Sequence, residues 1–408
     1  MSINKTLFEK FIPYLYFLIP ISLVSGPFFP DAIVSIIAVF FAYKLFKENN
    51  IFFIEQLKIV LFLIFCIFLI IRALLSVNIF ESIVPSIFYF RFGLFALATV
   101  YLIKKIPNFE KNFTKCLLYT IIFISADAYI QIIFGYNLFG MKNLVSDRVS
   151  GLFGDEYVLG SYLVRLFPLL LALMIDRIEF NLKNILIFII SISLLNLLVF
   201  LTAERTAFIL NLIFLALLTL TISKIRKILL ATFLISIVLF GASIKLNKSL
   251  YERMIMQTYS EVYKGQKLRV FTEGHQNHIT SALKMFQDNK LFGHGVKNYR
   301  VVCKDLKYFE TTTSCSTHPH NTFAQLLAET GLFGFSFILF IFLYICRELF
   351  INILSSFTNK EINNKKAIIS ILIFINLFPF SPSGSFFNNW LSIIYFLPIG
   401  FYLNQLKK

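Results

Sequence analysis

Residues 318–334 read HPHNTFAQLLAETGLFG, a stretch that closes a long polar loop and opens a strongly apolar segment. Two imidazoles, those of His318 and His320, stand directly before an expected helix start. Asn321 follows them, and an asparagine side chain is well suited to cap the first turn of a helix. Such a helix would hold the neighbouring His320 at its entrance.

The helix expected after Asn321 carries a polar stripe. Gln325 and Glu329 are four residues apart and therefore share one helix face. A polar stripe that leads into an apolar segment is unusual. We therefore expect Gln325 and Glu329, together with Asn321 and His318, to contact a substrate.

The composition is that of a polytopic membrane protein. The chain has 408 residues, of which 58% are hydrophobic and 15% charged, and its mean hydropathy is +0.77. Soluble proteins are closer to a quarter charged. The net charge of +16 can be placed by membrane topology, so no nucleic-acid partner is expected. The first apolar segment lacks a signal-peptide cleavage pattern and is expected to remain as an anchor.

An all-α fold with about twelve transmembrane helices is expected from the apolar runs. Several runs are shorter than the roughly 20 residues that a perpendicular span needs. Proline in the first, eleventh and twelfth runs indicates kinks or a partly re-entrant path. The runs lie roughly at 11–26, 30–46, 57–76, 83–103, 114–135, 157–175, 183–202, 205–222, 228–245, 331–350, 366–381 and 387–404.

The loops between these runs predict an orientation. With the N-terminus inside, the inside segments contain twenty Lys or Arg, among them Lys5, Lys407 and Lys408 near the termini, whereas the short outside loops contain only Lys142, Arg148 and Arg205. Cytoplasmic loops are enriched in basic residues. Both termini are therefore expected on the cytoplasmic side.

One outside loop, residues 246–330, is long and contains all five histidines. Ile279, Leu283 and Phe286 within it have helical spacing, so we expect a small, partly helical extracytoplasmic cap. The expected parts are helices 1–9 in residues 1–245, the cap in residues 246–330 and helices 10–12 in residues 331–408.

Cysteine and histidine spacing in this loop leaves two questions open. Cys303 and Cys315 are separated by eleven residues; outside the cytoplasm a disulfide is allowed, and two unpaired thiols are the alternative. His275-x-x-His278 and the two histidines before Asn321 offer four imidazoles, but no closely placed cysteine or carboxylate set accompanies them. No metal is therefore expected. Without a Walker or Rossmann glycine motif, the use of ATP or a nucleotide-sugar on the inside has no support, and no cofactor is expected.

Three arginines near the outer surface are candidate binding residues. Arg205, in LTAERTAF (201–208), is either an interfacial anchor or part of a site, and Glu204 either pairs with it or is solvated. Arg269, in KLRVF, would on its own be a surface residue. Arg148 opens a polar segment on the same side, as does SPSGSFFNNW at 381–390.

His320 is the strongest candidate for a catalytic base. A histidine before a helix is more often a capping or packing residue than a catalyst. A neutral imidazole is nevertheless well suited to accept a hydroxyl proton near neutral pH. His318 is the weaker candidate of the two.

The pair His320-Asn321, nine further residues and a Gly-x-x-Gly motif resemble the signature of the O-antigen ligase family of membrane glycosyltransferases. The order of Arg205, Arg269, an amphipathic helix and a Gly-x-Gly turn is similar to that family as well. The resemblance implies a GT-C-like fold in the bacterial inner membrane with a periplasmic active site. It implies that Arg205 and Arg269 bind a diphosphate and that His320 deprotonates the acceptor.

The resemblance also implies substrates. The donor would be a glycan on undecaprenyl diphosphate and the acceptor a sugar hydroxyl of lipid A–core, with inversion and without a metal. An O-antigen or exopolysaccharide polymerase and a protein O-oligosaccharyltransferase share the donor and the motif. A transporter or flippase is the alternative of a different class, but a transporter site usually lies near mid-membrane, whereas these histidines lie outside.

Overall fold

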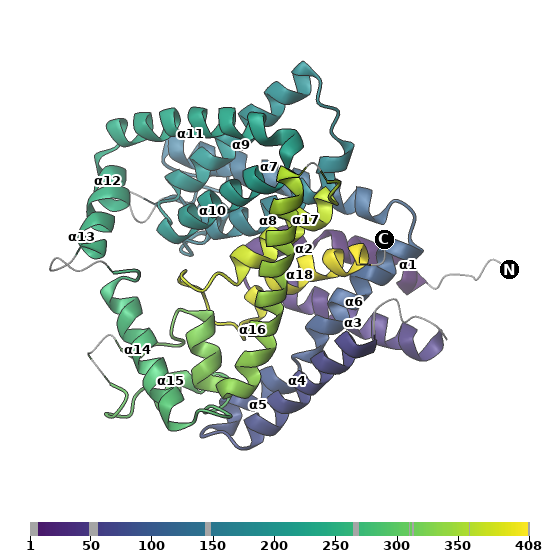
Figure 1. Cartoon of the computed structure of the whole chain (residues 1–408), viewed down its shortest axis with the longest axis vertical. Helices are drawn as coiled ribbons and strands as arrows, with labels where there is room; N and C mark the ends of the chain where they lie inside the picture. The colour runs from purple at the N-terminus through teal and green to yellow at the C-terminus, as the bar shows by residue number, and fades with distance from the viewer. Residues whose placement is uncertain are drawn as a thin grey trace.

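The computed structural model describes residues 7–48, 56–142, 148–263, 269–309, 311, 314–358 and 360–406. Helices joined by turns and loops make up the fold (Figure 1). Within these ranges no β-strand forms, and extended pairing is confined to one isolated bridge between Tyr136 and Lys142. The predicted all-α fold is confirmed.

Each predicted apolar run overlaps at least one of the helices. In chain order they are α1 (Leu7–Phe17), α2 (Ile19–Ser22), α3 (Phe28–Lys47), α4 (Gln56–Leu74), α5 (Ile79–Ile87), α6 (Phe90–Lys105), α7 (Phe109–Phe134), α8 (Leu159–Met174), α9 (Leu182–Leu201), α10 (Arg205–Thr221), α11 (Arg226–Leu246), α12 (Lys248–Tyr251), α13 (Thr258–Val262), α14 (Glu273–Asp288), α15 (Tyr299–Val302), α16 (Thr322–Phe357), α17 (Asn364–Asn376) and α18 (Asn389–Gln405). Four 3-10 turns, η1 (Leu23–Ser25), η2 (Gly151–Phe153), η3 (Ile175–Arg177) and η4 (Ser223–Ile225), and a π-helix, η5 (Glu252–Gln257), lie between them.

Eight segments of the described chain are long and apolar enough to cross a membrane. They are α3, α4, the α5–α6 pair, α7, α8 with η3, α9, α11 with η4, and α16. The predicted count of twelve is not confirmed, because α1, α10, α17 and α18 have 11, 17, 13 and 17 residues and a perpendicular span needs about 20. The terminal residues Lys5, Lys407 and Lys408 of the orientation argument lie outside the described part.

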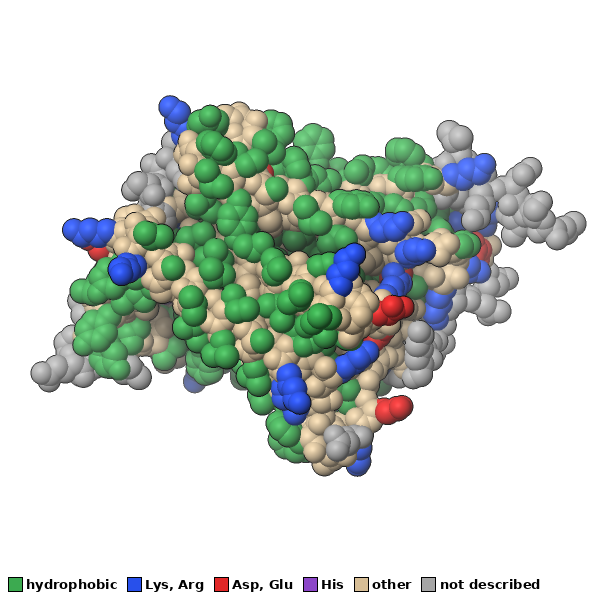
Figure 2. All heavy atoms as spheres, turned by 90° about the horizontal axis from the view of Figure 1, so that it is seen from above, with side chains coloured by type: hydrophobic (Ala, Val, Ile, Leu, Met, Phe, Trp, Pro, Cys, Tyr) green, Lys and Arg blue, Asp and Glu red, His purple; other side chains and the backbone are tan. Residues whose placement is uncertain are grey.

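Large apolar side chains are exposed over much of the surface. Phe46 is 92% exposed and Phe80 is 90% exposed, which water would disfavour and lipid would not. Figure 2 shows one face on which hydrophobic side chains spread between patches of Lys and Arg. Such extensive exposure of apolar side chains is typical of a membrane protein.

Helices α8 and α17 form the centre of the bundle (Figure 1). Helix α17 packs against α8, α10, α16 and α18, and α8 also packs against α7 and α9. Leu163, Leu166 and Leu169 of α8 are fully buried. Because α8 is surrounded in this way, a polar side chain on it faces protein or an internal cavity rather than lipid.

The region 246–330 forms a partly helical cap, with α12, η5, α13, α14 and α15. Residues 264–268, 310 and 312–313 of this region lie outside the described part. The predicted helix appears as α14, which packs against the first turns of α16. Ile279 and Met285 of α14 are buried there in one cluster with Ala324 and Ala328 of α16.

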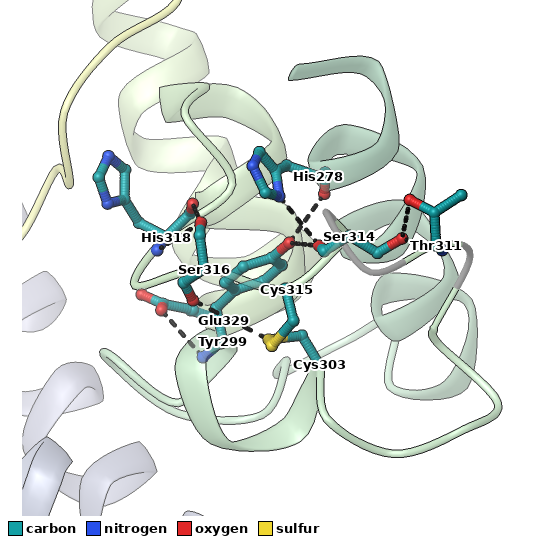
Figure 3. Close-up of a disulfide and its surroundings, with 9 residues drawn as sticks. All are labelled: His278, Tyr299, Cys303, Thr311, Ser314, Cys315, Ser316, His318 and Glu329. Atoms are coloured by element: carbon teal, nitrogen blue, oxygen red, sulfur yellow. Dashed lines mark hydrogen bonds between the residues drawn. A yellow bond between two sulfur atoms is a disulfide. The ribbon is translucent and has the colours of Figure 1, made fainter. Parts of the chain in front are cut away.

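The cysteine pair of the cap is oxidised. Cys303 and Cys315 form a disulfide with their Cα atoms 5.4 Å apart (Figure 3). Of the two alternatives for this pair, the disulfide is therefore the one found. It ties the segment before the histidine motif to α15.

Two glycines dock the cap onto a kink in α16. Gly331 interrupts the helix with φ +62°, and Gly293 has φ +67°. A Cβ on Gly331 would lie 2.4 Å from the backbone of Leu291, and one on Gly293 would lie 2.4 Å from the backbone of Glu329. Only glycine permits both the conformation and the close approach, so the first glycine of the Gly-x-x-Gly motif serves helix docking.

Candidate functional site

One cavity of about 1310 Å³ opens between the cap and the bundle. Its lining comes from the segment after α2, the segment before α8, the start of α10, the cap and the α17–α18 connection. Basic side chains and imidazoles dominate its charged lining. They are Arg148, Arg165, Arg205, Arg253, Arg269, Arg300, His275, His318 and His320, against the three carboxylates Glu156, Glu204 and Glu261.

Arg205 is the first residue of α10 and lines this cavity. Its guanidinium donates two hydrogen bonds to the carboxylate of Glu261 on α13, at 2.7 and 3.3 Å. This fork-to-fork pairing is the geometry in which arginine binds carboxylates and phosphates. A bound phosphate would have to displace Glu261 from the same donors.

Arg269 lines the same cavity as Arg205. Its guanidinium lies 4.0 Å from the carboxylate of Glu273, and its side chain is 37% exposed. The looser ion pair and greater exposure leave it freer to reorient than Arg205. The structure thus brings together two arginines that are 64 positions apart in the sequence.

His320 lies at the centre of a cluster of four imidazoles. Its ring centroid is 4.1 Å from that of His318, 5.4 Å from that of His275 and 5.3 Å from that of His278. Its backbone has φ +52°, a left-handed conformation that few residues other than glycine, asparagine, aspartate and histidine adopt. Its carbonyl oxygen accepts a hydrogen bond from the backbone N–H of Ser383, at 2.9 Å, which fixes the motif to the α17–α18 connection.

The segment before the motif holds the His278 imidazole in place (Figure 3). The Tyr299 hydroxyl lies 2.8 Å from the carbonyl oxygen of Ser314 and 3.1 Å from that of His278, and donates to them. The His278 Nδ1 lies 3.0 Å from the same Ser314 oxygen, so that nitrogen carries the proton. The His318 Nε2 is buried and has no hydrogen-bond partner among the described residues.

Burial and repulsion by neighbouring imidazoles keep His318 and His320 neutral. Burial, followed by the charges of His318, His275 and His278, lowers the pKa of His320 to about 3. Burial also lowers the pKa of His318 to about 4. His320 is therefore unprotonated at pH 7 but weakly basic. An anion bound beside it would favour the charged form and raise the pKa again.

Acid should destabilise this cluster. The folded-state pKa values of His318 and His320 lie below the usual 6.5, so the unfolded chain binds protons first as the pH falls. Their contribution to the free energy of unfolding is complete above about pH 6.5 and is lost towards pH 3. We expect thermal unfolding of the purified protein to show a shallower loss of stability between pH 7 and 5 in His318→Gln than in the wild type. If stability falls equally with pH in His318→Gln and the wild type, the lowered pKa of His318 in the folded protein is contradicted.

The other predicted substrate-binding residues divide into two groups. Arg148 lines the cavity, with its guanidinium 4.2 Å from the Tyr157 ring centroid. Asn321 caps α16 as expected, accepting from the Ala324 N–H at 3.0 Å. It does not line the cavity.

Gln325 and Glu329 are buried beneath the cavity rather than in its lining. The Gln325 Nε2 donates to Glu329 at 3.0 Å and to the Ser385 hydroxyl at 3.0 Å. The Glu329 carboxylate also accepts from the Tyr299 N–H, at 3.2 Å. The polar stripe thus connects α16 to the cap and to the α17–α18 connection, and the structure does not bring it to the cavity.

Several lining residues were not singled out from the sequence as site residues. The sequence offered a reason to consider Arg165, because a charge inside an apolar span is expected to face the bundle interior. The sequence offered no reason to consider Arg253, Arg300 or Glu261, because isolated charges are common in a long polar loop.

The described residues contain no group of three or more His, Cys, Asp or Glu that could hold a metal ion. The three imidazoles around His320, with ring centroids 4.1–5.4 Å from its own, do not form such a group with it. Metal-independent chemistry remains a prediction.

Fold and cavity together define a polytopic α-helical membrane protein with a cationic, histidine-containing cavity. Residues 186–340 match the family model described as O-Antigen ligase, so this part of the chain is similar to that family. The matched region runs from α9 into α16 and includes Arg205, Arg269 and His320. It indicates O-antigen ligase-type activity and a glycosyltransferase-like enzyme. No curated protein sequence matches the chain significantly.

Proposed function

We propose that this protein transfers a glycan from undecaprenyl diphosphate to a sugar hydroxyl of lipid A–core at the periplasmic face of a bacterial inner membrane. One observation carries the proposal: six arginines and three imidazoles line a single cavity of about 1310 Å³. A lining with this many basic groups favours an anionic ligand, and the arginine fork suits phosphate in particular. A diphosphate linked to a lipid meets both the charge and the apolar surroundings.

The proposed reaction is a direct displacement. Arg205 and Arg269 hold the diphosphate and stabilise the negative charge that develops on it as the anomeric C–O bond breaks. A ring nitrogen of His320 accepts the proton of the acceptor hydroxyl while its oxygen bonds to the anomeric carbon from the opposite face. The products are the inverted glycoside and the polyprenyl diphosphate.

Binding of the donor would make His320 a stronger base. Without an anion the pKa of His320 lies near 3, which is too low for efficient proton transfer at pH 7. The negative charge of a bound diphosphate would raise it towards the useful range. Proton abstraction would then be confined to the donor-bound state.

The proposal is tested by transfer with purified, reconstituted protein. We expect a labelled glycan to move from polyprenyl diphosphate to lipid A–core, and to do so equally well in EDTA, because the sequence has no acidic metal motif at the outer surface. Transfer to a second lipid-linked glycan instead would identify a polymerase, and transfer to protein an O-oligosaccharyltransferase. Absence of transfer to all three acceptors would contradict the proposed function, and inactivation by EDTA that Mg²⁺, Mn²⁺ or Zn²⁺ reverses would contradict metal independence.

A further inference from the structure

Arg165 is a buried guanidinium without an ion-pair partner among the described residues. It lies on α8, is 6% exposed and lines the cavity. Its Nε has no hydrogen-bond partner among the described residues, and its Nη1 makes one long contact of 3.4 Å to the carbonyl oxygen of Ser161. Breaking or omitting the partner of a buried charge is strongly unfavourable, so this residue is built to meet an anion that arrives from the cavity.

The neighbouring carboxylate is committed elsewhere. Glu204 acts on Arg165 electrostatically, but its two oxygens accept from the start of α8. They accept from the Gly160 N–H at 2.6 Å, and from the Ser161 N–H and hydroxyl at 3.2 and 2.8 Å. Glu204 therefore fixes the helix that carries Arg165 rather than neutralising Arg165.

The arginines of the cavity thus differ in their readiness for a ligand. Arg205 and Arg269 have the carboxylates of Glu261 and Glu273 as partners. An incoming phosphate must compete with those carboxylates, whereas nothing among the described residues competes for Arg165.

Arg165 also lies further from the start of its helix than Arg205 does. The hydrogen bonds from Gly160 and Ser161 to Glu204 hold the starts of α8 and α10 side by side. Arg165 is six residues beyond Leu159, the first residue of α8, which is about 9 Å along the helix axis. Arg205 is the first residue of its helix. Val24, Ile209 and Trp390 add apolar surface to the same cavity.

We propose that Arg165 binds the phosphate attached to the lipid chain of the polyprenyl diphosphate donor, below the arginines that hold the sugar-linked phosphate. This inference rests on the proposed function. A lipid chain stays in the bilayer because each buried CH₂ contributes about 0.8 kcal/mol. The lipid-linked phosphate is therefore the deeper of the two, as Arg165 is the deeper arginine.

The test is binding of a polyprenyl monophosphate, which has only the lipid-linked phosphate, to the full chain in nanodiscs. We expect Arg165→Gln to weaken binding about 10- to 100-fold, the range of one charge-assisted hydrogen bond. Arg177→Gln is the matched control. Arg177 is the last residue of η3, which follows α8 at its other end; it is 47% exposed and shares its partner Glu110 with Lys365. This control should bind as the wild type does.

A second readout separates ligand binding from a structural role. Removal of an unpaired buried charge should leave the ligand-free Arg165→Gln protein at least as stable to heat as the wild type, while stabilisation by polyprenyl monophosphate is lost. Equal affinity in Arg165→Gln and the wild type, or no binding by the wild type, overturns the inference. Equally tight, Arg165-dependent binding of phosphatidylglycerol overturns it too, because the site would then hold a bulk lipid headgroup.

The inference and the proposed function can fail separately. If the wild type transfers glycan and Arg165→Gln binds and transfers equally well, only the inference about Arg165 is wrong. If polyprenyl monophosphate binds through Arg165 but the wild type transfers no glycan, the binding site stands and the proposed reaction is wrong.

Discussion

Replacing His320 should abolish glycan transfer while the protein still folds and inserts. General-base catalysis is typically worth about 10² to 10⁴ in rate, so transfer by the purified variant should fall by at least about a hundredfold. His320→Asn is the sharper variant, because asparagine tolerates the left-handed backbone at this position (φ +52°) and alanine is strained there. His320→Ala should be equally inactive but less stable.

His294→Gln is a suitable control for this experiment. His294 lies in the same cap, but its Nε2 contacts the Met285 carbonyl oxygen at 2.9 Å, a bond that a glutamine amide can replace, and it does not line the cavity. We expect transfer by this variant to match the wild type. Activity of His320→Asn within about tenfold of the wild type would remove His320 from the role of base.

Arg205→Lys and Arg269→Lys should each impair transfer severely. An ammonium group keeps the charge but cannot offer two parallel N–H donors to one phosphate. Loss of one charge-assisted hydrogen bond corresponds to about a 10- to 100-fold loss of donor affinity. Transfer should fall further in Arg205→Lys than in Arg269→Lys. The Arg205 guanidinium already makes the two hydrogen bonds to Glu261 that a phosphate would take over.

The measurement is kcat/KM for the lipid-linked donor, together with donor affinity. Arg347→Lys, at an exposed position of α16, controls for a general effect of the exchange. Lysine variants at positions 205 and 269 that bind and react normally would make both arginines interfacial anchors, and the phosphate site would then lie elsewhere.

Local features of the fold could be predicted from the sequence because they depend on short-range patterns. The Asn321 cap, the start of α10 at Arg205 and the amphipathic α14 each follow from a few neighbouring residues. The number of spans could not be predicted in this way. Whether a 13-residue apolar helix such as α17 crosses a membrane depends on its neighbours, and α17 is enclosed by four other helices.

The candidate site was only partly accessible to sequence reasoning. The family signature pointed to Arg205, Arg269 and His320, and all three line one cavity. Nothing local reveals that Glu329 is bound to the cap, because its partner Tyr299 is thirty positions away and uses its backbone N–H. The same holds for the pairing of Arg205 with Glu261, which depends on how the cap folds back over α10.

A density map of the wild-type protein with a non-reactive polyprenyl diphosphate glycan tests the central claim most directly. The account predicts the diphosphate in the cavity between Arg205 and Arg269, with Glu261 displaced from the Arg205 fork and the His320 ring facing the anomeric carbon across the acceptor position. A diphosphate that touches only one of these arginines, or a His320 ring turned away from the sugar, would contradict the mechanism even if the chain transfers glycan.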